Sequence, residues 1–275
     1  MDRRVYQQME AVEDRHWWFL GRRAVIAAVL GDPTKSRDPA VNGRLARAVG
    51  AGDRAAAGGI GHPMRVLDAG CGSGGNVGLY AGWGPVLGVD TEAEALGQAR
   101  RRGYRGVAVA SLAALPFADD VFDLVAATDV VEHVADDAEA LRELLRVTRP
   151  GGHLVLTVPA YRWLWSDSDV QLGHFRRYTR SQLVGRCRAA GAEVTRASYF
   201  NTTLLPAIAA ARWVRQRRGQ PMVATELEQT GPLANRLLRL PMAGEARLVG
   251  AGANLPAGVS IVCLCRKPEA PRPAE

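Results

Sequence analysis

The chain has 275 residues, which is long enough to bury one sizeable core, so a single domain with additions is expected rather than two domains. Its formal net charge is +7, but the arginines are scattered among acids, which disfavours a nucleic-acid partner because such binding needs a clustered basic face. Sparse cysteines, a polar N-terminus and the lack of any long apolar run predict a cytoplasmic protein without signal peptide or transmembrane segment.

The first 62 residues fall into two segments. Apolar spacing predicts helix over residues 3–30, interrupted by the aromatic cluster His-Trp-Trp-Phe at 16–19, so residues 1–30 are expected to form an N-terminal helical segment. Residues 31–62 are rich in Gly, Ala, Pro and Arg without a steady period, which is typical of a flexible linker or insertion.

From residue 64 onward, short apolar runs alternate with amphipathic stretches. The stretches predict helices at 75–82, 92–102, 136–147 and 179–190, and Pro150-Gly151-Gly152 should separate the third of these from the next strand. The apolar runs predict strands at 64–69, 85–90, 104–109, 121–128, 152–158, 192–198 and 259–266. This alternation predicts an α/β fold, a parallel sheet with helices on both faces, with its core at 63–198 and its last strand and tail at 259–275.

Two additions interrupt the alternation. Residues 160–178 form a long aromatic-rich connection, and residues 199–258 form a helical insertion with apolar helices near 202–216 and 232–241. Ligands of open α/β sheets bind outside the carboxyl ends of the strands, where both additions begin. We therefore expect them to form the wall and cap of a substrate pocket.

A glycine-rich loop follows the first predicted strand, in the sequence VLDAGCGSGGN at 66–76. The apolar run ends at Asp68, and Gly70, Gly72 and Gly74 follow at alternate positions. Such glycines let the backbone turn sharply and approach a ligand closely. The order differs from the G-x-G-x-x-G dinucleotide fingerprint, and Asp68 would repel a pyrophosphate and attract a cation. The loop predicts a nucleoside with a positively charged, amine-bearing tail.

Asp90 closes the second predicted strand, about 20 residues after the glycine loop. A carboxylate at this position can accept hydrogen bonds from both hydroxyls of an adenosine ribose. Alternatively, Asp90 caps the helix that begins near Glu92. Its place downstream of the glycine loop favours the ribose contact.

Several segments recur in the order of a known family: VLDAGCGSG (66–74), GVD (88–90), LPF (115–117), FDLVAATDVVEHV (122–134), LLRVTRPGGHLVLTVP (144–159) and GHFRRYT (173–179). With them the chain resembles class I S-adenosylmethionine-dependent methyltransferases, on the branch of the ubiquinone- and menaquinone-biosynthesis enzymes. The resemblance covers about 64–198. It implies a Rossmann-like, seven-stranded, mostly parallel sheet whose last strand, at 259–267, inserts antiparallel.

The resemblance implies S-adenosyl-L-methionine as cofactor and S-adenosyl-L-homocysteine as product. Asp68 and the loop backbone would hold the methionine end, and Asp90 the ribose. Ser111 stands where the family usually has an aspartate for the adenine amine, so its side-chain contact is in question. The implied cofactor-binding residues are Trp18, Arg22, Asp68, Ala69, Gly70, Gly72, Asp90, Thr91, Ser111, Leu112 and Thr128.

The N-terminal cluster resembles the helix with which related enzymes cover the bound cofactor. Trp18 can lie against a sulfonium by cation–π attraction, and Arg22 can hold the cofactor carboxylate. The alternative is an aromatic staple that fixes the helix to the core. The residues leave both interpretations open.

Methyl transfer requires alignment, exclusion of water and, for weakly nucleophilic acceptors, removal of a proton. His133 is more often structural in the family, and His174 has the alternative role of anchoring its loop. No metal site is predicted, because the histidines are dispersed and no carboxylates pair with them at ligand spacing. The candidate catalytic residues are Asp129, His133, Tyr161, His174 and Tyr178.

The sequence thus predicts an S-adenosylmethionine-dependent methyltransferase that acts on oxygen, nitrogen or carbon of a small-molecule acceptor, in secondary or cofactor metabolism. One alternative is a protein of the same fold that binds S-adenosylmethionine but catalyses a non-methylating reaction such as a cyclisation. Another is a methyltransferase associated with nucleic acid or with a membrane surface, through the basic amphipathic helix at 202–218. The sequence also leaves open whether the protein forms a homodimer.

Overall fold

The computed structural model describes residues 3–31, 64–218 and 230–269, so the predicted linker at 31–62 lies almost entirely outside the described residues. Within them, one sheet has the strand order β3-β2-β1-β4-β5-β7-β6. Its strands are β1 (Val66–Ala69), β2 (Val86–Asp90), β3 (Gly106–Val109), β4 (Phe122–Thr128), β5 (Thr148–Pro159), β6 (Glu193–Phe200) and β7 (Ser260–Arg266). β7 runs antiparallel to both of its neighbours, β5 and β6, and the other neighbouring strands are parallel. This confirms the predicted mostly parallel, seven-stranded sheet.

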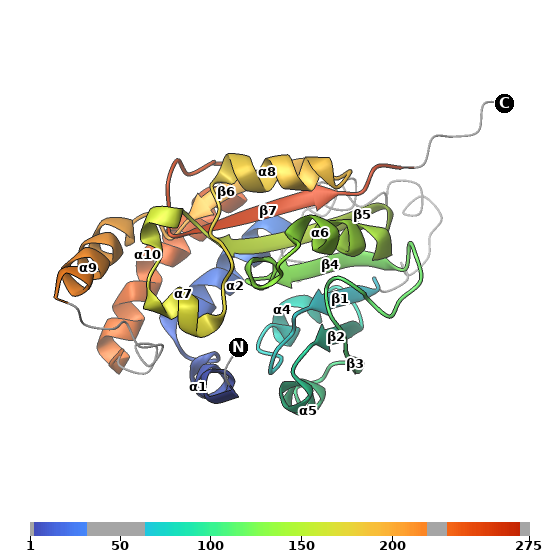
Figure 1. Ribbon diagram of the computed structural model, residues 1–275, viewed down its shortest axis with the longest axis horizontal. Helices are drawn as coiled ribbons and strands as arrows, with labels where there is room; N and C mark the ends of the chain where they lie inside the picture. The colour runs from blue at the N-terminus through green and yellow to red at the C-terminus, as the bar shows by residue number, and fades with distance from the viewer. Residues whose placement is uncertain (1–2, 32–63, 219–229, 270–275) are drawn as a thin grey trace.

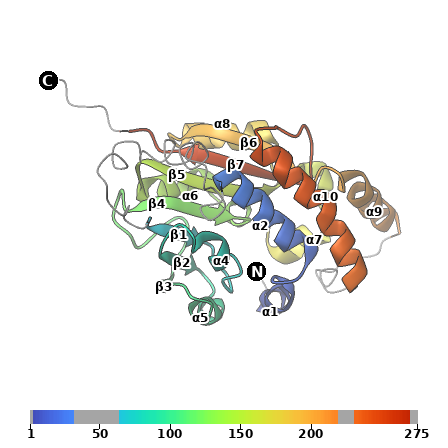
Figure 2. The same cartoon turned by 180° about the vertical axis from the view of Figure 1, so that it is seen from behind.

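Helices cover both faces of this sheet (Figure 1). On one face, α6 and α8 pack against the sheet through Leu141 and Leu183. On the other face, α2 and α10 pack against it through Ile26 and Met242. Figure 2 shows α2 and α10 side by side. The helices are α1 (Arg3–Val12), α2 (Trp17–Leu30), α4 (Val77–Tyr80), α5 (Ala93–Arg101), α6 (Asp137–Val147), α7 (Asp167–Leu172), α8 (Arg180–Ala189), α9 (Leu205–Arg217) and α10 (Pro232–Gly250), with short 3-10 turns at η3 (Val131–His133) and η4 (Arg162–Leu164).

The N-terminal helices divide into two roles. α2 is part of a core layer, since Val25 and Ile26 are fully buried. It packs closely on α10, because a Cβ at Gly21 would lie 2.7 Å from the Met242 side chain. α1 instead lies near the helix and loops that follow β1 (Figure 1). Residues 1–30 therefore form more than a cover, because α2 belongs to the core.

Two boundaries differ from the sequence-based expectation. Pro150, Gly151 and Gly152 lie inside β5 rather than before it, where the register with β4 shifts and Gly151 adopts a φ of +74°. A bulge accommodates them, because Gly151 tolerates the left-handed backbone and its N–H donates to the Lys267 carbonyl at 2.9 Å. The helix expected at 232–241 continues through Pro241 to Gly250.

Candidate functional site

Three strained residues mark one edge of the sheet. Asp129 and Asn201 follow directly on the carboxyl ends of β4 and β6, Tyr161 lies two residues after the end of β5, and the three have φ values of +55°, +60° and +55° in this order. Non-glycine residues adopt this conformation at an energetic cost, and such strain gathers at functional sites. The same edge is where open α/β sheets bind ligands.

Asp68 lies at this edge, at the end of β1, and its side chain is fully buried. One carboxylate oxygen accepts a hydrogen bond from the Tyr104 hydroxyl at 2.6 Å, and the other has no hydrogen-bond partner among the described residues. Burial raises the pKa of Asp68 to about 7. A buried carboxylate with one unsatisfied oxygen, beside a glycine-rich turn, fits the ammonium group of a cofactor.

The glycine loop holds its shape through close contacts. Gly70 has a φ of +80°, and a Cβ there would lie 2.3 Å from a Val130 methyl group. Asp90 fixes the next turn, because its two carboxylate oxygens accept hydrogen bonds from the backbone N–H groups of Gly72 at 2.8 Å and Glu92 at 3.0 Å. Asp90 thus joins the loop to the residue that precedes α5, and its contact with a ribose stays a prediction.

The residues expected to border the adenine differ in exposure. Thr91 and Ser111 are exposed, whereas Leu112 is buried. The Ser111 hydroxyl already accepts a hydrogen bond from the Ala113 N–H at 3.2 Å, so its side chain stabilises its own turn. This local bond agrees with the doubt about a Ser111 side-chain contact to the cofactor.

The N-terminal helices are bonded to the glycine loop. The Ser73 hydroxyl donates to Glu13 at 2.6 Å, and the Arg23 guanidinium donates to the Gly75 carbonyl at 2.9 Å. Arg102, at the end of α5, forms an ion pair with Glu13 at 2.8 Å. The turn between α1 and α2 therefore closes over the loop, as a cover would.

Arg22 links this cover to the end of β4. Its guanidinium is buried, pairs with Asp129 and lies 4.8 Å from the centre of the Trp18 ring. Asn76 accepts a hydrogen bond from Arg22 at 3.4 Å and donates one to Thr128 at 3.0 Å. Trp18 thus faces the Arg22 guanidinium, and its contact with a sulfonium stays a prediction.

A second polar cluster lies beyond Asp129. The rings of His133 and His174 are 4.6 Å apart, and His174 Nδ1 donates to Asp169 at 2.7 Å. Arg177 donates to the same carboxylate at 2.7 Å. The fully buried Asp169 therefore fixes the orientation of the His174 ring, which is compatible with both a catalytic and a loop-anchoring role.

The structure brings the carboxylate of Glu132 together with His133 and His174, although the sequence suggested that the histidines are dispersed. Ligand-type atoms of Glu132, His133 and His174 lie within 4.8 Å of one another. Burial raises the pKa of Glu132, with the charge of Asp129 adding to it, and burial lowers the pKa of His133 to about 4. At neutral pH the His133 imidazole is therefore uncharged. A second group of ligand-type atoms, the thiols of Cys187, Cys263 and Cys265, is buried in the core.

The two tyrosine candidates do not join this cluster. The Tyr178 side chain is buried and its hydroxyl donates to Asp137 at 2.8 Å, so a catalytic role for Tyr178 stays a prediction. Tyr161 stacks between Trp163 and Tyr199, with ring centres 5.5 and 5.1 Å away. Burial and its bond with Tyr199 raise the pKa of Tyr161 to about 12, so it keeps its proton near neutral pH.

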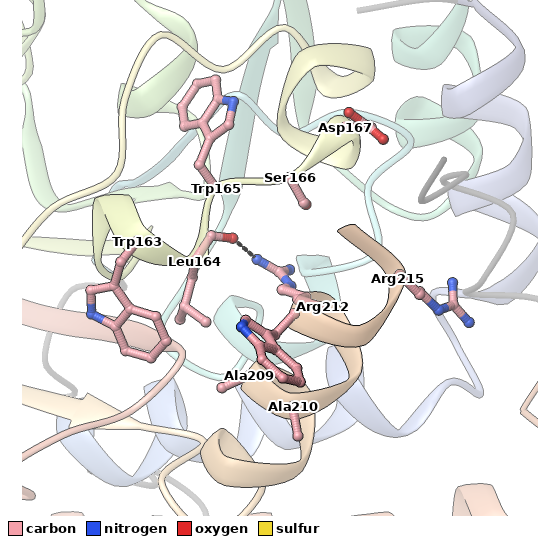
Figure 3. Close-up of a pocket in the computed structure, with 10 residues that line it drawn as sticks. Trp163, Leu164, Trp165, Ser166, Asp167, Ala209, Ala210, Arg212 and Arg215 are labelled. Atoms are coloured by element: carbon pink, nitrogen blue, oxygen red, sulfur yellow. Dashed lines mark hydrogen bonds between the residues drawn. The ribbon is translucent and has the colours of Figure 1, made fainter. Parts of the chain in front are cut away.

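A pocket of about 450 Å³ opens between the aromatic connection and α9 (Figure 3). In this view the Arg212 guanidinium points to the Leu164 carbonyl, to which it donates. Burial lowers the pKa of Arg212 to about 10, so it stays charged at neutral pH, and its Nε has no hydrogen-bond partner among the described residues. The lining residues are Trp163, Leu164, Trp165, Ser166, Asp167, Ala209, Ala210, Arg212, Trp213 and Arg215.

The pocket adjoins the His174 cluster through Ser166. The backbone N–H of Ser166, which lines the pocket, donates to Asp169 at 2.8 Å, and Asp169 holds His174. Residues of the 160–178 connection and of α9 thus line one pocket together, and its use for a substrate stays a prediction. No residue of the glycine loop lines it, so the cofactor residues and this pocket are separate parts of one edge.

Sequence reasoning did not single out Glu13, Asn76, Glu132, Asp169 or Arg177. The contacts of Glu13 with Ser73 and of Asn76 with Thr128 join residues that are 60 and 52 positions apart in the sequence, so no local pattern predicts them. Asp169 and His174 are five residues apart, and this spacing around a short helix was the one available signal.

Comparison with known proteins gives one family. Residues 67–156 match the family described as "Methyltransferase domain". A protein of Mycolicibacterium smegmatis, named as an S-adenosylmethionine-dependent methyltransferase, is 33% identical over 133 residues, 47% of this chain and 52% of that protein. The chain thus spans about half the length of this relative. A demethylmenaquinone methyltransferase of Mycolicibacterium paratuberculosis is 60% identical over only 42 residues, 15% of this chain and 18% of that protein.

The solved structures share the fold. A chain from the complex between the Haloferax volcanii Trm112 methyltransferase activator and a methyltransferase superposes with a TM-score of 0.51 at 20% identity. The match covers 83% of this chain and 96% of that one. The likeness therefore extends beyond the segment that the family match covers.

Proposed function

Since the chain contains a class I S-adenosylmethionine-dependent methyltransferase domain, we propose that it transfers a methyl group from S-adenosylmethionine to an apolar small-molecule acceptor that carries an anionic group. The observation that supports this most is the pair of carboxylates at the ends of β1 and β2. Asp68 keeps one buried oxygen unsatisfied beside the glycine loop, and Asp90 closes the neighbouring strand.

Asp68 and Asp90 would hold the two ends of the cofactor. A cationic ammonium beside the free oxygen of Asp68 would remove the penalty of that unsatisfied buried atom. Asp90 already anchors the loop through Gly72, and a carboxylate accepts more than the two hydrogen bonds that it has from the backbone. S-adenosylmethionine supplies an electrophilic methyl group on its sulfonium. The protein has to align the acceptor with it and exclude water.

The acceptor would occupy the pocket between Trp163 and Trp213. Indole rings suit an apolar or aromatic body, and Arg212 offers a buried guanidinium with an unpartnered Nε to an anionic group. His174, held by Asp169, would accept a proton where the acceptor is a weak nucleophile. These assignments place acceptor and base on the 160–178 connection and donor binding on β1 and β2.

The test is incubation of the protein with S-adenosylmethionine and candidate acceptors, with S-adenosylhomocysteine and methylated product measured together by mass spectrometry. We expect both to accumulate in equal amounts, and Arg212→Met to raise the KM for anionic acceptors. Turnover of an acceptor without S-adenosylhomocysteine release would contradict methyl transfer and favour a non-methylating reaction such as a cyclisation.

A further inference from the structure

Helix α10 is apolar on two opposite sides. One side is buried against α2 and the sheet through Met242, Ala246 and Val249. The opposite side carries leucines that are between 54% and 72% exposed and that recur along one stripe of the helix: Leu233, Leu237, Leu240 and Leu248. A helix that is apolar all round is normally buried all round, so this stripe has the character of a contact surface.

The surroundings of this stripe are strongly basic. Together α9 and α10 contain six arginines and a single acid, Glu245. That acid is buried and occupied, because it accepts hydrogen bonds from the backbone N–H groups of Thr202 and Thr203 at 3.0 and 2.8 Å. The exposed surface of the two helices therefore combines leucines with arginines, including Arg236 and Arg239 of α10.

We propose that α10, with α9 beside it, docks on an anionic lipid membrane surface. Leucines that enter the acyl boundary and arginines that reach phosphate headgroups are the features of helices that lie in the membrane interface. Among the described residues, no helix combines the length and the apolar character that a membrane span requires.

Two other occupants fit less well. In a two-fold dimer through this stripe, the same arginine-rich surface would face itself, and like charges would oppose each other without acids to compensate them. Nucleic acid would engage the arginines but leave the exposed leucines without a partner. Only an anionic lipid surface satisfies both kinds of side chain.

The docking surface adjoins the acceptor pocket. Figures 1 and 2 show α9 and α10 at the same end of the molecule, and Trp213 of α9 both lines the pocket and is 54% exposed. A membrane at α10 would therefore bring lipid-soluble acceptors near the pocket. This consequence rests on the proposed function, whereas membrane binding itself does not.

The test is flotation of the full chain with phosphatidylcholine vesicles, with and without phosphatidylglycerol. We expect flotation only with the anionic vesicles, weaker in high salt, and reduced about tenfold or more by combined Leu233→Gln, Leu237→Gln and Leu240→Gln. The matched control is Val170→Gln, which removes a 65% exposed apolar side chain from α7 and should leave flotation unchanged. Arg236→Gln with Arg239→Gln should weaken flotation without touching the apolar stripe.

Several results would overturn the proposal. They are equal binding to both vesicle types, flotation unaffected by the leucine and arginine variants, a dimer in light scattering that the leucine variant dissociates, or salt-sensitive RNA binding in place of lipid binding. Calorimetry with S-adenosylmethionine in the absence of lipid separates the two proposals. The leucine variant should bind the cofactor as the parent does, which also shows that it is folded.

Discussion

Replacement of Asp68 by Asn should stabilise the free protein at alkaline pH while it weakens cofactor binding. The folded state holds Asp68 fully buried, and burial raises its pKa from the ordinary 3.8 to about 7. Between these values the folded state keeps a proton that the unfolded state has released, so stability falls as the pH rises through this window and is level above it. Asparagine is neutral at every pH and can still accept the hydrogen bond from Tyr104.

The magnitude follows from the pH window. One unit of pKa corresponds to about 1.4 kcal/mol, and about two pH units of the window lie between pH 5 and 7. On going from pH 5 to pH 8 the parent should therefore lose about 3 kcal/mol relative to Asp68→Asn. Other titrating groups are present in both proteins and cancel in this comparison.

The assay is urea unfolding of both proteins at pH 5 and pH 8 without cofactor. Calorimetry with S-adenosylmethionine over the same range should show that parent affinity rises with pH as the carboxylate forms, and that the variant binds more weakly. A stability difference that does not change between pH 5 and 8 would refute the argument, since it would mean that Asp68 does not titrate in this range.

Three further changes test individual residues. Asp90→Ala should weaken cofactor binding by about 1–3 kcal/mol in calorimetry, since charge-assisted hydrogen bonds are lost; unchanged affinity would overturn the ribose contact. His174→Ala should lower turnover by about 100-fold or more with cofactor affinity near that of the parent; an equal loss in both would mean that the 160–178 loop is structural. Glu132→Gln, which removes the ligand-type carboxylate beside His133 and His174, should preserve turnover, and so should treatment with EDTA, because transfer of a methyl group from a sulfonium needs no metal ion; activity that EDTA abolishes and a divalent ion restores would establish a metal site instead.

The sheet could be predicted from sequence because its strands are buried on both faces. β4 and β5 contain the apolar runs 124–127 and 154–156, and the glycines after β1 mark a turn that few other residues allow. The bulge at residues 150–152 was missed because glycine and proline usually end an element, and only the pairing with Lys267 shows that the strand continues.

The site itself was only half predictable. Asp68 and Asp90 lie within recognisable motifs, so the sequence predicts where they lie in the fold. The pairing of Arg22 with Asp129 joins residues 107 apart, and Glu132 is recognised as unusual only through its complete burial. The sequence predicts an apolar helix in this region but not the exposed leucine stripe of α10, because the spacing of apolar residues does not show which of two apolar sides faces the core.

The most direct test of the central claim is a crystal structure of the protein with S-adenosylhomocysteine. We predict the ligand at the carboxyl ends of β1 and β2, with its amine beside the free oxygen of Asp68 and its ribose hydroxyls on Asp90. Density for the ligand in the pocket of Trp163 and Trp213 alone, or none at saturating concentration, would contradict the assignment of this chain as a methyl transferase of the proposed kind.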